Sequence, residues 1–400
     1  MNKQTTENEL RDSRQEWLRE IPAGWKLSKI GSLYSLRNTK VSDKDFAPLS
    51  VTMKGIVPQL ETAAKSDDGD NRKLVRKGDF AINSRSDRRG SCGISEYDGS
   101  VSLINTVLTP KEEMDPGYYN WLFHTVSFAD EFYKWGHGIV DDLWTTRWQE
   151  MKRIVVPIPP LSVQHEIALS LDEKCSQIDA TIKEVEEGIE EYKKWKMSII
   201  YEATTKGLEK NVAYRDSGIW WIGQIPEKWR LIRVKHAVKI ENGSDPQTEG
   251  DIPVYGSGTG SFKTCGEYKE GPTVLLGRKG ATLHIPHYIE GRYWNVDTAF
   301  NTKIINPIIQ LKYFYYLAIC FDYPAYRSQT TLPSMTQTNY NSMHIPCPDM
   351  PEQASIVTFL DEKIEELDSH IKEKEDLIAD LESYKQSLIY ETVTGKRKVV

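Results

Sequence analysis

The chain has 400 residues, a net charge of −7 and five cysteines. Its mean hydropathy is negative, and no apolar run is long enough to cross a bilayer. The first residues are polar and lack the apolar core of a secretory signal. The cysteines form no C-x-x-C pair, which argues against a disulfide framework and against a zinc site. We therefore expect a cytoplasmic protein of two to four domains, without a membrane segment.

The acidic residues are concentrated in two segments. Residues 162–210 carry a net charge of −4 and residues 352–394 carry −8, so the rest of the chain carries +5. The charge of a surface patch, and not the total charge, governs attraction to phosphate. The acidic total therefore does not exclude nucleic acid as a partner.

Residues 1–20 are polar, and we predict a short N-terminal helical segment there. In residues 21–156, short β-rich runs alternate with turns rich in Gly and Asp. The runs at 73–75, 80–82 and 101–104 predict strands, and residues 118–132 have a helical pattern. We predict a mixed α/β globule for this segment.

A heptad stripe dominates the next segment, 157–210, because its apolar residues recur with alternating steps of four and three. A helix from Ser162 to Tyr201 would be about 60 Å long, which is longer than a globular core needs. Prolines from Pro157 to Pro160 keep its entry extended, and Gly207 marks its end. The stripe includes Leu171, Ile178, Ile182, Val185 and Ile189.

Residues 211–345 repeat the plan of the first globule, with a predicted strand at 273–276 and an apolar helix at 313–321. Residues 346–400 then repeat the long helix, which follows prolines and ends near Gly395. Lys196 and Lys385 interrupt the two stripes at equivalent positions, where they could specify the register of helix pairing. The second stripe includes Leu360, Ile364, Leu367, Ile371, Ile378 and Leu381.

The chain is an internal repeat. The motif Ile21-Pro22-x-x-Trp25 recurs 204 residues later, whereas the helical segments recur after 189 residues. The ends of the two copies are therefore similar, and their middles have diverged. Since residues 215–221 resemble the beginning of the chain, we expect the N-terminal segment to pack beside the end of the second helix, with pseudo-two-fold symmetry.

Motifs for catalysis are scarce. No glycine-rich phosphate loop follows a strand, and residues 306–309 match an amino-methyltransferase motif only in part. His284 and His287 flank a proline without a carboxylate or cysteine at ligand spacing, so we interpret them as a polar turn. We identify no catalytic residues and no metal site.

Basic turns are more informative. Arg85 follows a predicted strand, as Arg278 does 193 residues later, and both turns contain glycine. Arginine at a loop tip can bind guanine edges or phosphate. A solvated charged turn is the alternative, but the recurrence in both middles favours binding. Polar and aromatic stretches at 136–148 and 327–339 precede the prolines of each copy. The candidate DNA-binding residues are Lys54, Arg85, Arg88, Arg89, His137, Arg147, Ser257, Lys263, Arg278, Lys279, Thr331, Ser334 and Gln337.

The duplicated order of motifs resembles the DNA-specificity subunits of Type I restriction–modification enzymes. The shared features are two variable globules, two similar helices, the Ile-Pro-x-x-Trp openings, and proline-rich entries followed by Gln164 or Gln353. The resemblance extends over nearly the whole chain. It is stronger in the second globule, through the segments 255–258, 277–280 and 294–300.

This resemblance implies an α+β fold with two target-recognition domains, 21–156 and 211–345. The helical regions 157–210 and 346–400 would form an antiparallel coiled coil that sets the unread spacer of a bipartite DNA site. Two methyltransferase subunits would bind the helical scaffold, and motor-nuclease subunits would join them. S-adenosylmethionine, ATP and Mg²⁺ would serve those partners, and this chain would be non-catalytic.

Two other interpretations stay open from the residues alone. The chain could be a coiled-coil adaptor whose globules bind proteins, with the basic turns merely solvated. It could also carry a cryptic methyltransferase or nuclease site. Salt-dependent binding at a defined DNA site favours a DNA-specificity subunit over the adaptor, whereas methylation or cleavage by the isolated chain favours an enzyme.

Overall fold

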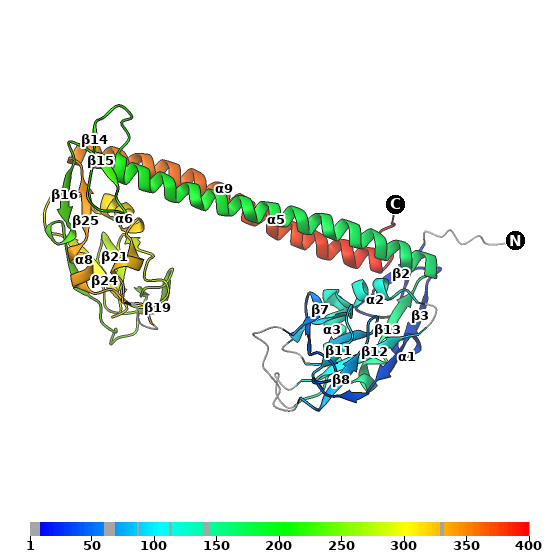
Figure 1. The fold of residues 1–400 in the computed structure, drawn as a ribbon. Coiled ribbons are helices and arrows are strands. Elements are labelled where there is room, and N and C mark those ends of the chain that lie inside the picture. The colour runs from blue at the N-terminus through cyan, green and yellow to red at the C-terminus, as the bar shows by residue number, and fades with distance from the viewer. Residues whose placement is uncertain are drawn as a thin grey trace. The chain divides into compact units, whose positions relative to one another are not determined.

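The computed structural model describes residues 9–59, 69–85, 88–111, 114–138, 144–328 and 332–399. It divides into two compact units (Figure 1). Unit 1 comprises Met1–Val185 and Asp376–Val400, and unit 2 comprises Glu186–Glu375. Each unit contains one α/β globule and about half of each long helix. No helix among the described residues is both long and apolar enough to cross a membrane.

The globule of unit 1 is built on a four-stranded antiparallel sheet in the order β10-β9-β12-β4. Smaller sheets pair β11-β8-β5, β6-β7 and β13-β3. The strands are β3 (Lys26–Lys29), β4 (Tyr34–Arg37), β5 (Lys40–Val41), β6 (Leu49–Thr52), β7 (Gly55–Pro58), β8 (Arg72–Val75), β9 (Phe80–Asn83), β10 (Cys92–Ile94), β11 (Gly99–Val101), β12 (Asn105–Pro110) and β13 (Val155–Ile158). The helices are α1 (Ile30–Leu33), α2 (Pro116–Phe123), α3 (Val126–Lys134) and α4 (Trp148–Met151).

Strand β9 shows why this sheet is buried on both faces. Successive side chains of a strand point to opposite faces. Phe80 and Ile82 belong to the cluster that contains the aromatic residues of α2 and α3, whereas Ala81 belongs to a second cluster with Val101 and Val107. The helix predicted at 118–132 is two helices in the structure, α2 and α3. Thr125 lies between them as the N-cap of α3, where its hydroxyl accepts from the amide of Phe128, at 3.2 Å.

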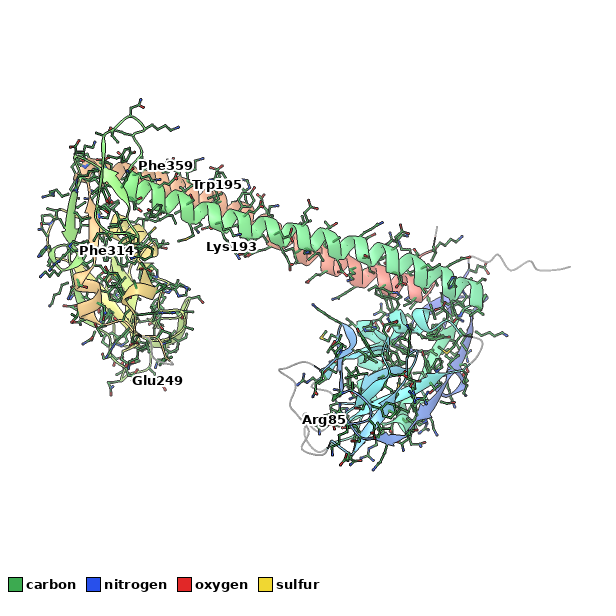
Figure 2. The ribbon with its side chains drawn as sticks, viewed as in Figure 1. Arg85, Lys193, Trp195, Glu249, Phe314 and Phe359 are labelled. Carbon is green, nitrogen blue, oxygen red and sulfur yellow. The ribbon has the colours of Figure 1, made fainter. Side chains whose placement is uncertain are left out.

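The globule of unit 2 repeats this plan with two four-stranded sheets, β17-β24-β21-β22 and β19-β18-β23-β20. The apolar face of α6 covers the first sheet, and Phe314 lies inside the globule (Figure 2). The strands are β14 (Tyr214–Asp216), β15 (Gln224–Pro226), β16 (Arg230–Arg233), β17 (Val238–Asn242), β18 (Ile252–Tyr255), β19 (Ser261–Cys265), β20 (Lys269–Glu270), β21 (Thr273–Gly277), β22 (His287–Ile289), β23 (Arg292–Asn295), β24 (Ala299–Ile304) and β25 (His344–Cys347). The helices are η3 (Val234–His236), α6 (Leu311–Ile319), α7 (Tyr323–Tyr326) and α8 (Gln337–Ser342).

Both predicted long helices are present, α5 (Leu161–Lys206) and α9 (Met350–Val393). Their proline-rich entries are strands, since β13 pairs with β3 and β25 pairs with β16. Gly207 and Gly395 follow the helix ends with φ of +76° and +73°, a left-handed conformation that favours glycine. The antiparallel pairing is confirmed, because in each unit a stretch of α5 lies alongside a stretch of α9 (Figure 1).

The two lysines in the heptad stripes form equivalent ion pairs between the helices. In unit 2, the Lys196 ammonium lies 2.7 Å from the Asp368 carboxylate. In unit 1, the Lys385 ammonium lies 2.5 Å from the Asp179 carboxylate. Residue for residue, each pair is the repeat of the other, as pseudo-two-fold symmetry requires. The predicted seam residues around them are buried or half-buried.

The predicted N-terminal helix is wrong for residues 9–20. Strands β1 (Leu10–Asp12) and β2 (Glu20–Pro22) form an antiparallel hairpin instead. The Asp12 carboxylate accepts from the amide of Arg14, and the Ser13 hydroxyl accepts from the amide of Gln15. Such local side-chain bonds compete with a helix. Residues 1–8 lie outside the described residues.

The predicted packing of the N-terminal segment beside the second helix is confirmed in unit 1. The Tyr390 hydroxyl of α9 donates to the carbonyls of Trp17 and Leu18, at 3.1 and 3.2 Å. In unit 2, the Tyr201 hydroxyl of α5 donates to the carbonyl of Ile222, at 3.0 Å. The two copies of the repeat therefore form equivalent hydrogen bonds at this position.

Candidate nucleic-acid interface

In unit 2, three loops meet at the turn after β21. The amide of Arg278 donates to the Thr298 carbonyl, and the Arg278 carbonyl accepts from the amide of Met335, both at 2.8 Å. The next residue, Lys279, forms an isolated bridge with Ser334. The basic turn is therefore held on one side by the loop before β24 and on the other by the polar stretch at 332–337.

The glycine-rich loop after β18 joins the same cluster. The Ser257 hydroxyl donates to the carbonyl of Lys279, and a Cβ at Gly280 would meet the Ser257 hydroxyl at 3.1 Å. Gly280 also has a φ of +111°. This turn therefore needs glycine both for its backbone conformation and for the close approach of the neighbouring loop.

The two cations of this turn have different surroundings. A guanidinium nitrogen of Arg278 donates to the Asp297 carbonyl at 3.2 Å, and the group lies over the Phe300 ring. The Lys279 ammonium lies 3.6 Å from the Asp297 carboxylate, and its side chain is 42% exposed. Arg278 therefore contributes to the shape of the turn, whereas Lys279 is held by a weak surface contact that phosphate could replace.

A half-buried lysine, Lys269, supports the loop before β24, and no motif in the sequence indicated this role. The Lys269 ammonium donates to the side-chain oxygens of Asn295 and Asn301, at 2.7 and 2.8 Å. The Asn295 amide in turn donates to the Ala299 carbonyl at 2.8 Å. Burial lowers the pKa of Lys269. These bonds fix both ends of the loop that contacts Arg278.

In unit 1, the turn after β9 has the same supports. Arg85 forms an isolated bridge with Thr145, and the amide of Thr146 donates to the Ser84 carbonyl at 2.9 Å. His137 also exchanges two backbone hydrogen bonds with Thr145, at 3.0 Å. Figure 2 shows Arg85 at the edge of its globule that lies away from the long helices α5 and α9.

Arg88 and Arg89 lie farther along this turn. Both side chains are exposed. The Tyr133 hydroxyl donates to the Arg88 carbonyl at 3.2 Å. The Arg89 guanidinium pairs with Asp130 and lies over the Tyr133 ring. Asp130 is thus a residue that sequence reasoning missed, because only the fold brings α3 to this turn.

The structure corrects the pairing of the two turns by one residue. Arg85 bridges Thr145, and Lys279 bridges Ser334. Thr145 and Ser334 are equivalent by the repeat of the helical segments. Lys279, and not Arg278, therefore occupies the position of Arg85. The sequence alone aligns Arg278 with Arg85, because each follows a predicted strand.

The remaining candidates lie at different distances from these turns. Arg147 and Gln337 lie within the polar stretches that support the turns, at the starts of α4 and α8, and Gln337 donates to the Asn242 side chain at 3.3 Å. Lys54 lies in the tight turn between β6 and β7, and Lys263 is exposed on the edge strand β19, where its ammonium lies over Phe262. Among the described residues, no hydrogen bond or ion pair joins the side chain of either lysine to these turns. Thr331 lies outside the described residues.

Metal ligands and reactive thiols give no second candidate. Among the described residues, no group of three or more His, Cys, Asp or Glu side chains could hold a metal ion. All five cysteines are free, and four of them are buried. Burial raises the pKa of the Cys175 thiol to about 11, so this thiol is not an activated nucleophile.

Comparison with known proteins identifies the second globule. Residues 226–377 match the family model described as the Type I restriction modification DNA specificity domain. These residues, which include most of the second globule and the first part of α9, are similar to that domain. The resemblance found in the sequence is thereby confirmed, and the matched residues include the turn that holds Arg278 and Lys279.

A curated relative agrees with this match. The Type I restriction enzyme MjaVIII specificity subunit of Methanocaldococcus jannaschii is 25% identical over 236 residues. The alignment covers 56% of this chain and 51% of the relative. The chain thus spans about half the length of the curated relative that it matches.

Solved structures extend the likeness in fold to nearly the whole chain. One matching chain comes from a study of complex assembly and conformational transition of the type I R-M system. It has a TM-score of 0.72 at 14% identity, and the match covers 93% of this chain and 98% of that one. The HsdS subunit from Thermoanaerobacter tengcongensis has a TM-score of 0.51 at 16% identity, with coverage of 94% and 98%. At sequence identities this low, the two matches show that the folds are similar and nothing more.

Proposed function

We propose that this chain is the non-catalytic specificity subunit of a Type I restriction–modification enzyme. Each globule reads one half of a bipartite DNA sequence, and the paired helices set the spacer. The observation that carries this proposal is the repeat of the specificity domain. Unit 1 presents Arg85 on the same backbone supports that present Lys279 in unit 2.

The partners follow from the same proposal. Two methyltransferase subunits bind the helical scaffold, and motor-nuclease subunits join them in the cytoplasm. S-adenosylmethionine, ATP and Mg²⁺ serve those subunits. The positive charge outside the helices, +5 by sequence, supports attraction of the globules to the DNA backbone.

Mapping modified adenines in the genome of the source organism tests the function. With the chain present, we expect methylation at one bipartite sequence, and deletion of its gene should remove every such site. In vitro, the complex with methyltransferase subunits should bind that DNA with an affinity that falls as salt rises. Methylation that persists after deletion, or DNA cleavage by the chain alone, would contradict the proposal.

The equivalence of Arg85 and Lys279 gives a specific prediction. We expect Arg85→Ala and Lys279→Ala to weaken DNA binding through different half-sites, by about 1–3 kcal/mol each if the cations contact base edges. Arg278→Ala should affect the same half-site as Lys279→Ala, because Arg278 shapes that turn through the Asp297 carbonyl. The measurement is binding to DNA with one half-site randomised at a time.

Matched controls separate contact from general charge. Arg76 in unit 1 and Arg292 in unit 2 are exposed arginines paired with Asp98 and Glu270. Arg76→Ala and Arg292→Ala should leave half-site preference unchanged. If Arg85→Ala and Lys279→Ala also leave it unchanged, these turns do not read DNA.

A further inference from the structure

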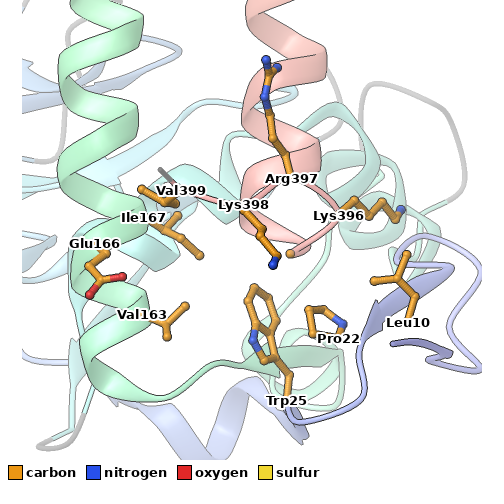
Figure 3. A pocket seen from close by; sticks show the side chains of 11 residues that line it. Leu10, Pro22, Trp25, Val163, Glu166, Ile167, Lys396, Arg397, Lys398 and Val399 are labelled. Atoms are coloured by element: carbon orange, nitrogen blue, oxygen red, sulfur yellow. The ribbon is translucent and has the colours of Figure 1, made fainter. Parts of the chain in front are cut away.

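A pocket of about 320 Å³ lies in unit 1, where the end of α9 meets the start of α5 and the N-terminal hairpin (Figure 3). Its floor is apolar, with Pro22, Trp25 and Val163 among the lining residues. Its rim carries the basic residues that follow α9. None of the DNA-binding candidates that the structure describes lines this pocket, so DNA recognition does not explain it.

Unit 2 fills the equivalent place with a carboxylate. The Trp229 indole nitrogen donates to the Glu352 carboxylate at 3.0 Å. The Lys228 ammonium lies 3.5 Å from the same carboxylate. A Cβ at Gly207 would meet both the Trp229 ring, at 3.0 Å, and the Glu352 carboxylate, at 3.2 Å. Indole, carboxylate and ammonium form one closed cluster at the start of α9.

Unit 1 keeps the frame of this cluster but lacks its acid. Trp25 is the repeat of Trp229, and Arg11 donates to the Trp25 carbonyl at 2.8 Å, as Arg215 does to that of Trp229. Val163 stands at the position of Glu352, and Gly24 at that of Lys228. Within the described part of the chain, the Trp25 indole nitrogen has no hydrogen-bond partner. The pocket is the space that the missing side chains leave.

A lysine from the other wall replaces the missing ammonium. Figure 3 shows the Lys398 side chain extending into the pocket with its ammonium toward Trp25. Lys398 is exposed. The Lys396 ammonium, in contrast, is already bound to the Leu18 carbonyl, at 3.1 Å, and to the Tyr390 hydroxyl, at 2.9 Å. Of the described residues that line the pocket, only Glu166 on α5 is acidic, and it is exposed. The rim therefore has an excess of positive charge.

We propose that this pocket binds a carboxylate side chain of a partner polypeptide, between the Trp25 indole N–H and the Lys398 ammonium. The proposal rests on the proposed function, which supplies the partner as a subunit of the same complex. The internal counterpart shows the ligand chemistry, because unit 2 fills its own site with a glutamate on a helix. Charge-assisted hydrogen bonds of this kind are stronger than neutral ones, and the apolar floor suits the methylene groups of an acidic side chain.

The test is to fill the pocket from within. Val163→Glu places an acid where Glu352 stands in unit 2, so it should compete with the partner. We expect it to weaken association with the methyltransferase subunit by roughly ten- to a hundredfold, measured by titration calorimetry on the full chain. Val163→Thr keeps the pocket open and Ser162→Glu adds the same charge one residue away, so both should bind as the wild type does.

Two outcomes separate this inference from the proposed function. A wild-type chain that does not associate with methyltransferase subunits overturns both. Association of Val163→Glu with wild-type affinity overturns only the pocket proposal.

Carbodiimide coupling gives a second readout that needs no pocket variant. It joins an ammonium directly to a carboxylate in contact. In the wild-type complex, Lys398 should be coupled to an Asp or Glu of the methyltransferase subunit, identified by mass spectrometry. Coupling of Lys398 only to an acid of this chain would show that the chain fills its own pocket, and would overturn the proposal.

Discussion

Replacing Gln353 with leucine is expected to destabilise unit 2 by about 3–5 kcal/mol. Gln353 is fully buried in the first turn of α9. Its side-chain oxygen accepts from the amide of Gln310 at 2.7 Å, and its nitrogen donates to the carbonyls of Ile308 and Pro348, at 2.8 and 2.9 Å. Leucine would remove all three of these hydrogen bonds, and the Ile308 and Pro348 carbonyls would keep only the weak Cys347 thiol as a donor. A buried polar group that loses its partner costs about 1–3 kcal/mol.

The repeat provides the matched experiment. Gln164 holds unit 1 in the same way, through the amide of Asp115 and the carbonyl of Pro159, at 2.9 and 2.8 Å. Hydrogen exchange should therefore accelerate in residues 226–375 for Gln353→Leu, and in the first globule for Gln164→Leu. Gln177→Leu, at an exposed position of α5, should change neither. Equal exchange in wild type and Gln353→Leu would mean that the buried bonds do not hold the globule.

The long helices were predictable because their signal is local and repeated. A heptad stripe needs only the spacing of apolar residues, and a glycine end needs only one residue type. Gln164 and Gln353 were also visible as parts of a motif. Their physical role was not visible, since each accepts from a backbone amide that lies 49 or 43 residues away along the chain.

The N-terminal hairpin and the equivalence of the basic turns could not be predicted from the sequence. A polar run such as residues 9–20 has no strong period, so local bonds from Asp12 and Ser13 decided its structure. The equivalence of Arg85 and Lys279 depends on which residue bridges the polar stretch. A shift of one residue in a diverged turn leaves no trace in composition, and only the backbone pairing reveals it.

The carboxylate cluster of unit 2 illustrates a third limit. Comparison of the copies by sequence shows Val163 against Glu352, which reads as ordinary divergence on a helix surface. Its meaning depends on Trp229, which meets Glu352 from far along the chain. The difference between Val163 and Glu352 thus became informative only once the structure showed which residues surround each position.

Inserting seven residues into both long helices is expected to change the spacer of the DNA site and to leave both half-sites unchanged. Glu187 and Asp376 are suitable positions, because they lie midway between the two lysine–aspartate pairs. A heptad adds about 10 Å to a helix and keeps the apolar seam in register. With DNA rising about 3.4 Å per base pair, the preferred spacer should lengthen by about three base pairs, read from the methylated sites.

DNA twist makes this prediction sharper. Three base pairs turn the duplex by about a third of its 10–10.5-base-pair repeat, so one heptad should also weaken binding by moving a half-site to another face. Three heptads add about nine base pairs, close to a full turn, and affinity should recover. A heptad in α5 alone has no opposing segment in α9 and should disrupt pairing instead. If paired insertions altered the half-sites while the spacer stayed the same, the helices would not act as the ruler, and the loops would have to sense the spacing themselves.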